Sequence, residues 1–208
     1  VSNVVPGDVV DVQTFKKRKA YYEGKAVKFH ELSEHRVDPI CEHFGVCGGC
    51  KWQNMKYSQQ LFFKHNEVKN HLQRIGKIDL PDFEPILGSE KQFFYRNKME
   101  FSFSNSRWLT EAEIGSSEEL DNKNALGFHI PKMWDKILDI NKCHLQEDPS
   151  NAIRNEVREF ANANGLTFFN PRAHEGLLRT LMLRTASTGE IMVLIQFFED
   201  DQANRVLL

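Results

Sequence analysis

The stretch Cys41–Cys50, CEHFGVCGGC, holds three of the chain's four cysteines at C-x5-C-x2-C spacing, and Cys143 lies far downstream in NKCHLQE. Because thiols stay reduced in the cytosol, a cysteine cluster indicates metal ligation rather than disulfides. Glycines between the thiolates let backbone N–H groups turn toward sulfur. Three local thiols and one remote thiol suit an iron–sulfur cluster better than zinc, which usually takes two matched ligand pairs.

Two other interpretations of the cysteines stay open at this point. His43 and His144 each sit close to an expected ligand and would complete a mixed zinc site. Four ordinary buried cysteines are the remaining alternative. The spacing excludes the C-x3-C-x2-C triplet of radical-SAM enzymes.

The composition of the chain is that of a globular protein. Its 208 residues are 40% apolar and 11% aromatic, enough for one or two hydrophobic cores. No apolar run of about twenty residues exists, and the N-terminus lacks the pattern of a signal peptide. We therefore expect a cytoplasmic protein with no membrane partner, and nothing indicates an obligate protein partner.

Basic residues cluster near the N-terminus of a chain whose formal net charge is −2. The run FKKRKAYYEGKAVK interleaves cations, which neutralise phosphates, with aromatic rings, which stack on unpaired bases. A second short basic stretch is YRNKMEFS, where alternation places Arg96 and Lys98 on one strand face. The candidate RNA contacts are Lys16, Lys17, Arg18, Lys19, Tyr21, Arg96 and Lys98. The alternative to RNA binding is a solvated turn for the first basic run and a solvated strand face for Arg96 and Lys98.

Hydrophobic periodicity predicts the elements of the first part of the chain. DVVDVQTF and YYEGKAVKFHEL alternate like short strands after a Pro-Gly turn, consistent with part of a small β-barrel. Apolar residues that recur every three or four positions predict a helix at Ser58–Ile75. Ser58 is expected to cap its N-terminus, and Gly76 to end it. Its apolar stripe is Leu61, Phe62, Val68, Leu72 and Ile75.

The pattern changes from Gln92 onward. Short strands, a helix at Asn151–Asn164 and the hairpin LRTLMLRTASTGEIMVLIQFF predict an α+β fold with a mainly antiparallel sheet. Tyr95 and Phe101 are either stacking or core aromatics. The acidic segment Thr110–Asn124 is typical of a solvated loop. Since the chain begins in a strand-like pattern and ends in the opening of a helix, we expect a piece of a larger protein.

The cysteine motif and its flanking residues resemble those of a known protein family. HRVDPICEHFGVCGGCKWQNMKYSQQLFFKHNEV, with ILDINKC around Cys143, resembles the iron–sulfur segment of the RNA uracil-5-methyltransferase family, the RumA and TrmA type, particularly its rRNA-modifying members. YRNKMEFSFS and LRTLMLRTASTGEIMVLI are similar to the family's central domain, so the resemblance covers essentially the whole chain. It implies that a [4Fe-4S] cluster is bound by Cys41, Cys47, Cys50 and Cys143.

The resemblance also implies a domain organisation. Residues 1–39 look like an OB-like β-barrel, a TRAM domain that lacks its first strand or strands. Residues 40–57 would be the cysteine loop of the central domain, and 81–208 the rest of that α+β domain. Residues 58–80, an amphipathic helix and linker, are expected to pack on the family's methyltransferase domain.

The chain departs from the family in one respect that decides its activity. The family's S-adenosylmethionine-binding domain, with its nucleophilic cysteine and general-base glutamate, has no counterpart before Leu208. Since the cluster uses all four cysteines, the resemblance implies that this chain contains no catalytic residue and is inactive alone. In the intact enzyme a cysteine adds to uracil C6, and methyl transfer to C5 follows after the base leaves its stack.

The expected partner is structured RNA, with 23S rRNA favoured over tRNA. The competing function is a stand-alone nucleic-acid-binding module, stabilised by zinc or a cluster and without catalysis.

Overall fold

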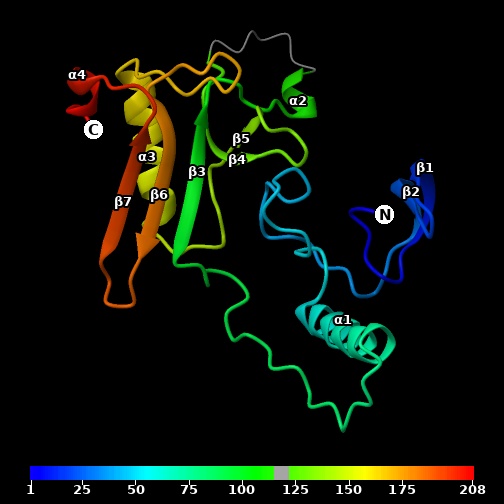
Figure 1. Cartoon of the computed structure of the whole chain (residues 1–208). Helices are drawn as coiled ribbons and strands as arrows, with labels where there is room; N and C mark the ends of the chain where they lie inside the picture. The colour runs from blue at the N-terminus through cyan, green and yellow to red at the C-terminus, as the bar shows by residue number, and fades with distance from the viewer. Residues whose placement is uncertain (115–121) are drawn as a thin grey trace. The chain divides into compact units, whose positions relative to one another are not determined.

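The computed structural model describes residues 1–114 and 122–208, which fall into two compact units (Figure 1). The first unit comprises Val1–Gly45 and Cys50–Gln92, and the second comprises Val46–Gly49 and Phe93–Leu208. Within the acidic segment expected to be a loop, Glu111–Ile114 forms the short helix α2. Residues 115–121 of that segment lie outside the described residues. No helix in the described ranges has the length and apolar character of a membrane span.

The first unit is built from a hairpin and a helix. The antiparallel strands are β1 (Val9–Lys17) and β2 (Tyr22–Glu31), as the alternating pattern predicts. They form a two-stranded sheet, and no closed barrel is present in the part of the chain that the structure describes. Helix α1 (Tyr57–Asn70) continues into the π-helical turn η1 (His71–Ile75).

Asp8 organises the turns around the hairpin. Its side chain, 1% exposed, accepts hydrogen bonds from the backbone N–H groups of Val5 (2.6 Å) and Ser33 (2.9 Å). The Arg36 guanidinium donates to both carboxylate oxygens, at 2.7 and 2.6 Å. Gly7 adopts a φ of +102°, and a Cβ there would lie 2.8 Å from Ser33 Oγ, so the predicted Pro-Gly turn requires glycine at this position.

Helix α1 begins one residue earlier than predicted. Lys56 occupies the N-cap position without a side-chain cap, so the predicted capping by Ser58 is wrong. The Gln60 side chain instead donates to the carbonyls of Trp52 and Met55, both at 2.9 Å, which joins the first turn to the preceding loop. Gly76 ends the helical segment as predicted.

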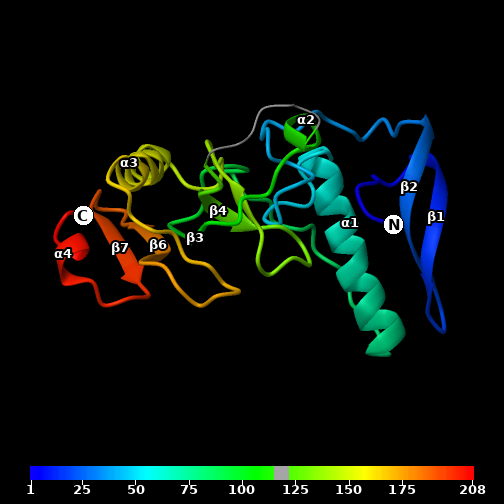
Figure 2. The ribbon, with the colours of Figure 1, turned by 90° about the horizontal axis from the view of Figure 1, so that it is seen from above.

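The second unit is a five-stranded antiparallel sheet in the order β5-β4-β3-β6-β7. Helix α3 lies along one face of the sheet (Figures 1 and 2). The strands are β3 (Lys98–Ser104), β4 (Ala125–His129), β5 (Ile137–Asp139), β6 (Leu178–Thr185) and β7 (Ile191–Phe197). The helices are α3 (Ser150–Ala163) and α4 (Gln202–Arg205). The predicted α+β class with antiparallel sheets is confirmed.

Alternation along β3 defines the two faces of this sheet. Met99 and Phe101 are buried, at 4% and 0% exposure, and the Arg154 guanidinium of α3 lies 5.1 Å from the centre of the Phe101 ring. Phe101 is therefore a core aromatic and not a stacking residue. Lys98, Glu100 and Ser102 point to the opposite face, away from α3.

Candidate functional site

The cysteine loop places glycine backbone next to sulfur. The Gly49 N–H donates to Cys47 Sγ at 3.4 Å, as expected for glycines between metal-binding thiols. A Cβ on Gly48 would lie 3.0 Å from the carbonyl oxygen of His129, so the small residue allows this part of the loop to approach the end of β4. All four cysteines carry thiols rather than disulfides.

Two of these thiols lie in the first unit. Cys41 and Cys50 are both partly buried. Burial raises the pKa of the Cys41 thiol above its ordinary value, and the charge of the neighbouring Cys50 raises it further. A thiol whose negative charge is disfavoured in this way needs a compensating positive centre if it is to act as a thiolate.

Cys143, in the second unit, is buried and tightly positioned. The Asn151 side chain of α3 accepts from the Cys143 N–H (2.7 Å) and donates to the Cys143 carbonyl (3.2 Å). The next turn of α3 contributes Arg154, which is fully buried and donates to the Ile140 carbonyl at 3.0 Å. Helix α3 thus fixes the loop that carries Cys143.

Arg154 also supplies positive charge beside this cysteine. Burial lowers the pKa of Arg154 to about 10, and the charge of Cys143 opposes that shift. Arg154 therefore remains a cation at neutral pH. A buried cation favours a nearby thiolate over a thiol.

The donor chemistry fits a soft metal centre. Within the described residues, no three His, Cys, Asp or Glu side chains are arranged to hold a metal ion. Thiols are soft donors, and within the second unit the N–H group directed at Cys47 Sγ and the buried cation beside Cys143 are surroundings that stabilise thiolate ligands.

The expected RNA contacts at the hairpin tip are exposed. Tyr21 and Tyr22 are each 59% exposed. Arg18 forms an ion pair with Glu23 (2.8 Å), and Lys17 Nζ lies 5.8 Å from the centre of the Tyr22 ring. The tip therefore presents both cations and aromatic faces to solvent.

The second expected basic pair is arranged differently from the prediction. Arg96 precedes β3, and its backbone N–H donates to the Leu145 carbonyl (2.8 Å), whereas Lys98 is the first residue of the strand. The register places Lys98 directly opposite Arg184 of β6. Both are exposed, and like charges on facing residues repel, so this pair would gain from a bound anion. Arg184 could not be found from sequence because the strand register was unknown.

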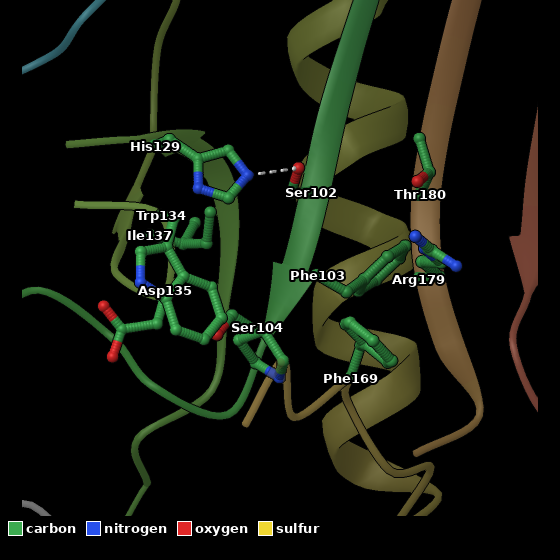
Figure 3. Close-up of a pocket in the computed structure, with 11 residues that line it drawn as sticks. Ser102, Phe103, Ser104, His129, Trp134, Asp135, Ile137, Phe169, Arg179 and Thr180 are labelled. Atoms are coloured by element: carbon green, nitrogen blue, oxygen red, sulfur yellow. Dashed lines mark hydrogen bonds between the residues drawn. The ribbon is translucent and has the colours of Figure 1, made fainter. Parts of the chain in front are cut away.

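A cavity of about 290 Å³ lies across β4, β3 and β6 in the second unit (Figure 3). Polar side chains from the three strands line it, namely His129, Ser102 and Thr180, together with Trp134, Asp135, Phe169 and Arg179. His129 Nε2 lies 3.4 Å from Ser102 Oγ. No motif in the sequence indicates this pocket, because its residues come from separate segments.

A second cavity of about 510 Å³ shares Asp135 and Pro171 with the first. Arg172 Nε donates to the Asp135 carboxylate at 2.7 Å, and this contact holds the pKa of Asp135 below its ordinary value. The Arg172 side chain is 73% exposed. The two cavities therefore meet at an ion pair whose cationic partner faces solvent.

Comparison with known proteins identifies relatives of the whole chain. No protein-family model matches it. It is 56% identical, over 94% of its length, to an uncharacterized RNA methyltransferase of Bacteroides thetaiotaomicron, and 46% identical, over 98%, to one of Porphyromonas gingivalis. These matches cover 43% and 45% of the two relatives, so the chain spans less than half the length of the curated relatives it matches.

A solved structure is similar over the same range. The tRNA (uracil-54, C5)-methyltransferase of Pyrococcus abyssi, in complex with S-adenosyl-L-homocysteine, superposes with a TM-score of 0.62 at 25% identity. The match covers 99% of this chain and 43% of that protein.

Proposed function

We propose that this chain is the RNA-binding portion of a SAM-dependent RNA (uracil-5-)-methyltransferase, because its relatives are RNA methyltransferases and a similar solved structure is a tRNA uracil-5 methyltransferase. The observation that carries the proposal is the 56% identity to an RNA methyltransferase over 94% of the chain. The structural neighbour, a tRNA uracil-5 enzyme crystallised with S-adenosyl-L-homocysteine, supports the reaction type and the methyl donor.

We assign the chemistry and the RNA grip to different parts of the intact protein. Residues 1–39 (TRAM-like) and 81–208 (central domain) bind folded RNA, and contacts to a flipped uridine and its neighbours offset the cost of unstacking it. The catalytic cysteine and the S-adenosylmethionine site belong to a further domain, on which residues 58–80 pack. This chain alone is then inactive. The substrate we favour is 23S rRNA, in the cytoplasm.

We further propose that Cys41, Cys47, Cys50 and Cys143 hold a [4Fe-4S] cluster. When bound, such a cluster contributes folding free energy as other structural metals do. Asn151 and Arg154 position Cys143 and favour its thiolate. A mixed zinc site that includes His43 or His144 is the competing assignment.

Iron content and the visible spectrum of freshly purified protein test the cluster. We expect a brown, iron-containing protein, and Cys143→Ser should lose iron and lower the melting temperature together. Lys142→Ala, an exposed neighbour, is the matched control and should change neither. A colourless protein with one bound zinc would refute the iron–sulfur assignment, and full iron with unchanged melting in Cys143→Ser would refute the role of Cys143.

Salt-dependent RNA binding tests the role of the hairpin tip. Replacing Lys16, Lys17, Arg18 and Lys19 by alanine should weaken binding to a folded RNA and flatten its salt dependence, because fewer counterions are released. The matched control removes the same charge from the α1 region, by alanine at Lys64, Lys69, Arg74 and Lys77. An unchanged salt slope in the tip variant would show that these cations are only solvated.

A further inference from the structure

We propose that the cavity between His129, Ser102 and Thr180 binds one unpaired nucleotide of the RNA (Figure 3). This inference rests on the proposed function. Three properties of the pocket support it: its stacking surfaces, its hydrogen-bonding groups and its charge.

Stacking surfaces line the pocket on more than one side. Trp134 is 63% exposed, although an indole ring of this size is usually mostly buried. Arg179 lies 5.1 Å from the centre of the Phe169 ring and 5.6 Å from that of Phe198, so two aromatic rings hold its planar guanidinium. Tryptophan rings and guanidinium planes are the surfaces on which proteins stack unpaired bases.

The hydrogen-bonding groups suit the edge of a base. Ser102 of β3 lies directly opposite Thr180 of β6. His129, on the strand β4 at the other edge of β3, lies next to Ser102. Each hydroxyl can donate or accept a hydrogen bond. A neutral imidazole donates from one ring nitrogen and accepts at the other. Such a set can pair with the alternating donors and acceptors of a nucleobase edge.

The surrounding charge favours a phosphate-bearing ligand. Asp135 is the carboxylate of the pocket, and its ion pair with Arg172 neutralises it. On the same face, the facing pair Lys98 and Arg184 lies about 13 Å along the strands from Ser102 and Thr180, at about 3.3 Å per residue. Glu100 stands between them and keeps the face from being uniformly basic.

The size of the cavity selects a single nucleotide. About 290 Å³ is at the lower limit of small-molecule sites. A base with part of its sugar would fill it, whereas a paired base in a duplex could not enter. The pocket therefore distinguishes looped from fully paired RNA.

Binding of two RNA probes tests this inference. One probe is a labelled hairpin with a loop of uridines, and the other is a fully paired duplex of the same length. Trp134→Ala should weaken hairpin binding about tenfold, as loss of one base–aromatic stack does, and leave duplex binding unchanged. Trp134→Phe, which keeps an aromatic face, should retain most of the affinity, and Met133→Ala, an exposed neighbour, is the control.

A second readout follows the indole directly. In a Trp52→Phe, Trp108→Phe background, Trp134 is the remaining tryptophan, and oligouridylate should quench its fluorescence. If Trp134→Ala binds the hairpin as the unchanged chain does, or if oligouridylate does not quench Trp134 in the Trp52→Phe, Trp108→Phe background, the pocket assignment is wrong while RNA binding stands. Equal loss for both probes would also overturn it. If the unchanged chain binds neither probe, the proposed function itself fails.

Discussion

Buried polar and charged side chains decide the conformation of loops that have little regular structure of their own. In the second unit, Arg154 and Asn151 satisfy the backbone around Cys143. In the first unit, Asp8 satisfies two backbone N–H groups and the Arg36 guanidinium. Because an unpaired buried polar group costs more free energy than a formed hydrogen bond contributes, these residues are sensitive positions.

Asp8 makes the stability of the first unit dependent on pH. Hydrogen bonding to Arg36 holds the pKa of Asp8 well below its ordinary value of 3.8. A carboxyl group whose pKa is lower in the folded state contributes stability that is complete above its unfolded pKa and is lost as the pH falls through the folded pKa. The contribution of Asp8 is therefore present at neutral pH and declines below pH 3.8.

We predict that Asp8→Asn lowers the free energy of unfolding by about 2 kcal/mol at pH 7. The difference from the unchanged chain should narrow below pH 3.8, where Asp8 of the unfolded chain takes up a proton while Asp8 of the folded chain still carries its charge. Denaturant titrations at several pH values measure this. Asp11→Asn, at a more exposed carboxylate, is the control, with a side chain that is 59% exposed. A cost for Asp8→Asn that does not change with pH would contradict the prediction.

At the scale of elements, helix α1 and strand β3 differ in what their apolar residues contact. The α1 helix has no buried residue, and Phe62 and Val68 are 56% and 50% exposed. Part of the predicted apolar stripe is thus exposed. On β3, by contrast, Phe101 is fully buried between α3 and Phe128.

We predict that Phe62→Ser changes the free energy of unfolding by less than about 0.5 kcal/mol, because the position is largely exposed. Phe101→Ala should cost about 4 kcal/mol, since it leaves a cavity in the core. Chemical denaturation compares the two variants. Sedimentation adds a second measurement, because an exposed apolar stripe favours self-association, which Phe62→Ser should reduce. A large loss of stability in Phe62→Ser would show that the helix packs on a surface of this chain.

At the scale of the whole molecule, the chain is two units with separate cores. The first includes Val5 and Met55, and the second is centred on Phe101 and Leu181. Since each core lies within its own unit, a substitution in one should leave the packing of the other intact.

We therefore predict two unfolding transitions in the metal-free protein. Asp8→Asn should lower the midpoint of one transition, and Phe101→Ala that of the other, in a calorimetric scan. Far-UV circular dichroism of each variant at low temperature controls for folding. A single transition that both substitutions shift equally would show that the two units unfold as one.

Local patterns in the sequence predicted most of the elements. Period-two alternation located the β1–β2 and β6–β7 hairpins, and the Asn151–Asn164 helix differs by one residue at each end from α3. The start of α1 was mispredicted. Ser58 lies inside the helix and not at its N-cap, because the position of a cap depends on where the preceding turn ends. The cysteine spacing and its resemblance to RNA methyltransferases identified the relatives that the comparisons show.

By itself, the sequence determined most of the secondary structure, the α+β class and the resemblance to RNA methyltransferases, since these depend on neighbouring residues and on motifs. Only the tertiary structure brought Lys98 opposite Arg184, buried Arg154 beside Cys143 and assembled His129, Ser102 and Thr180 around one cavity. The strand pair and the cavity join segments far apart in the chain, and Arg154 reaches Cys143 because α3 packs beside its loop. They depend on strand register and helix packing, which local periodicity does not encode.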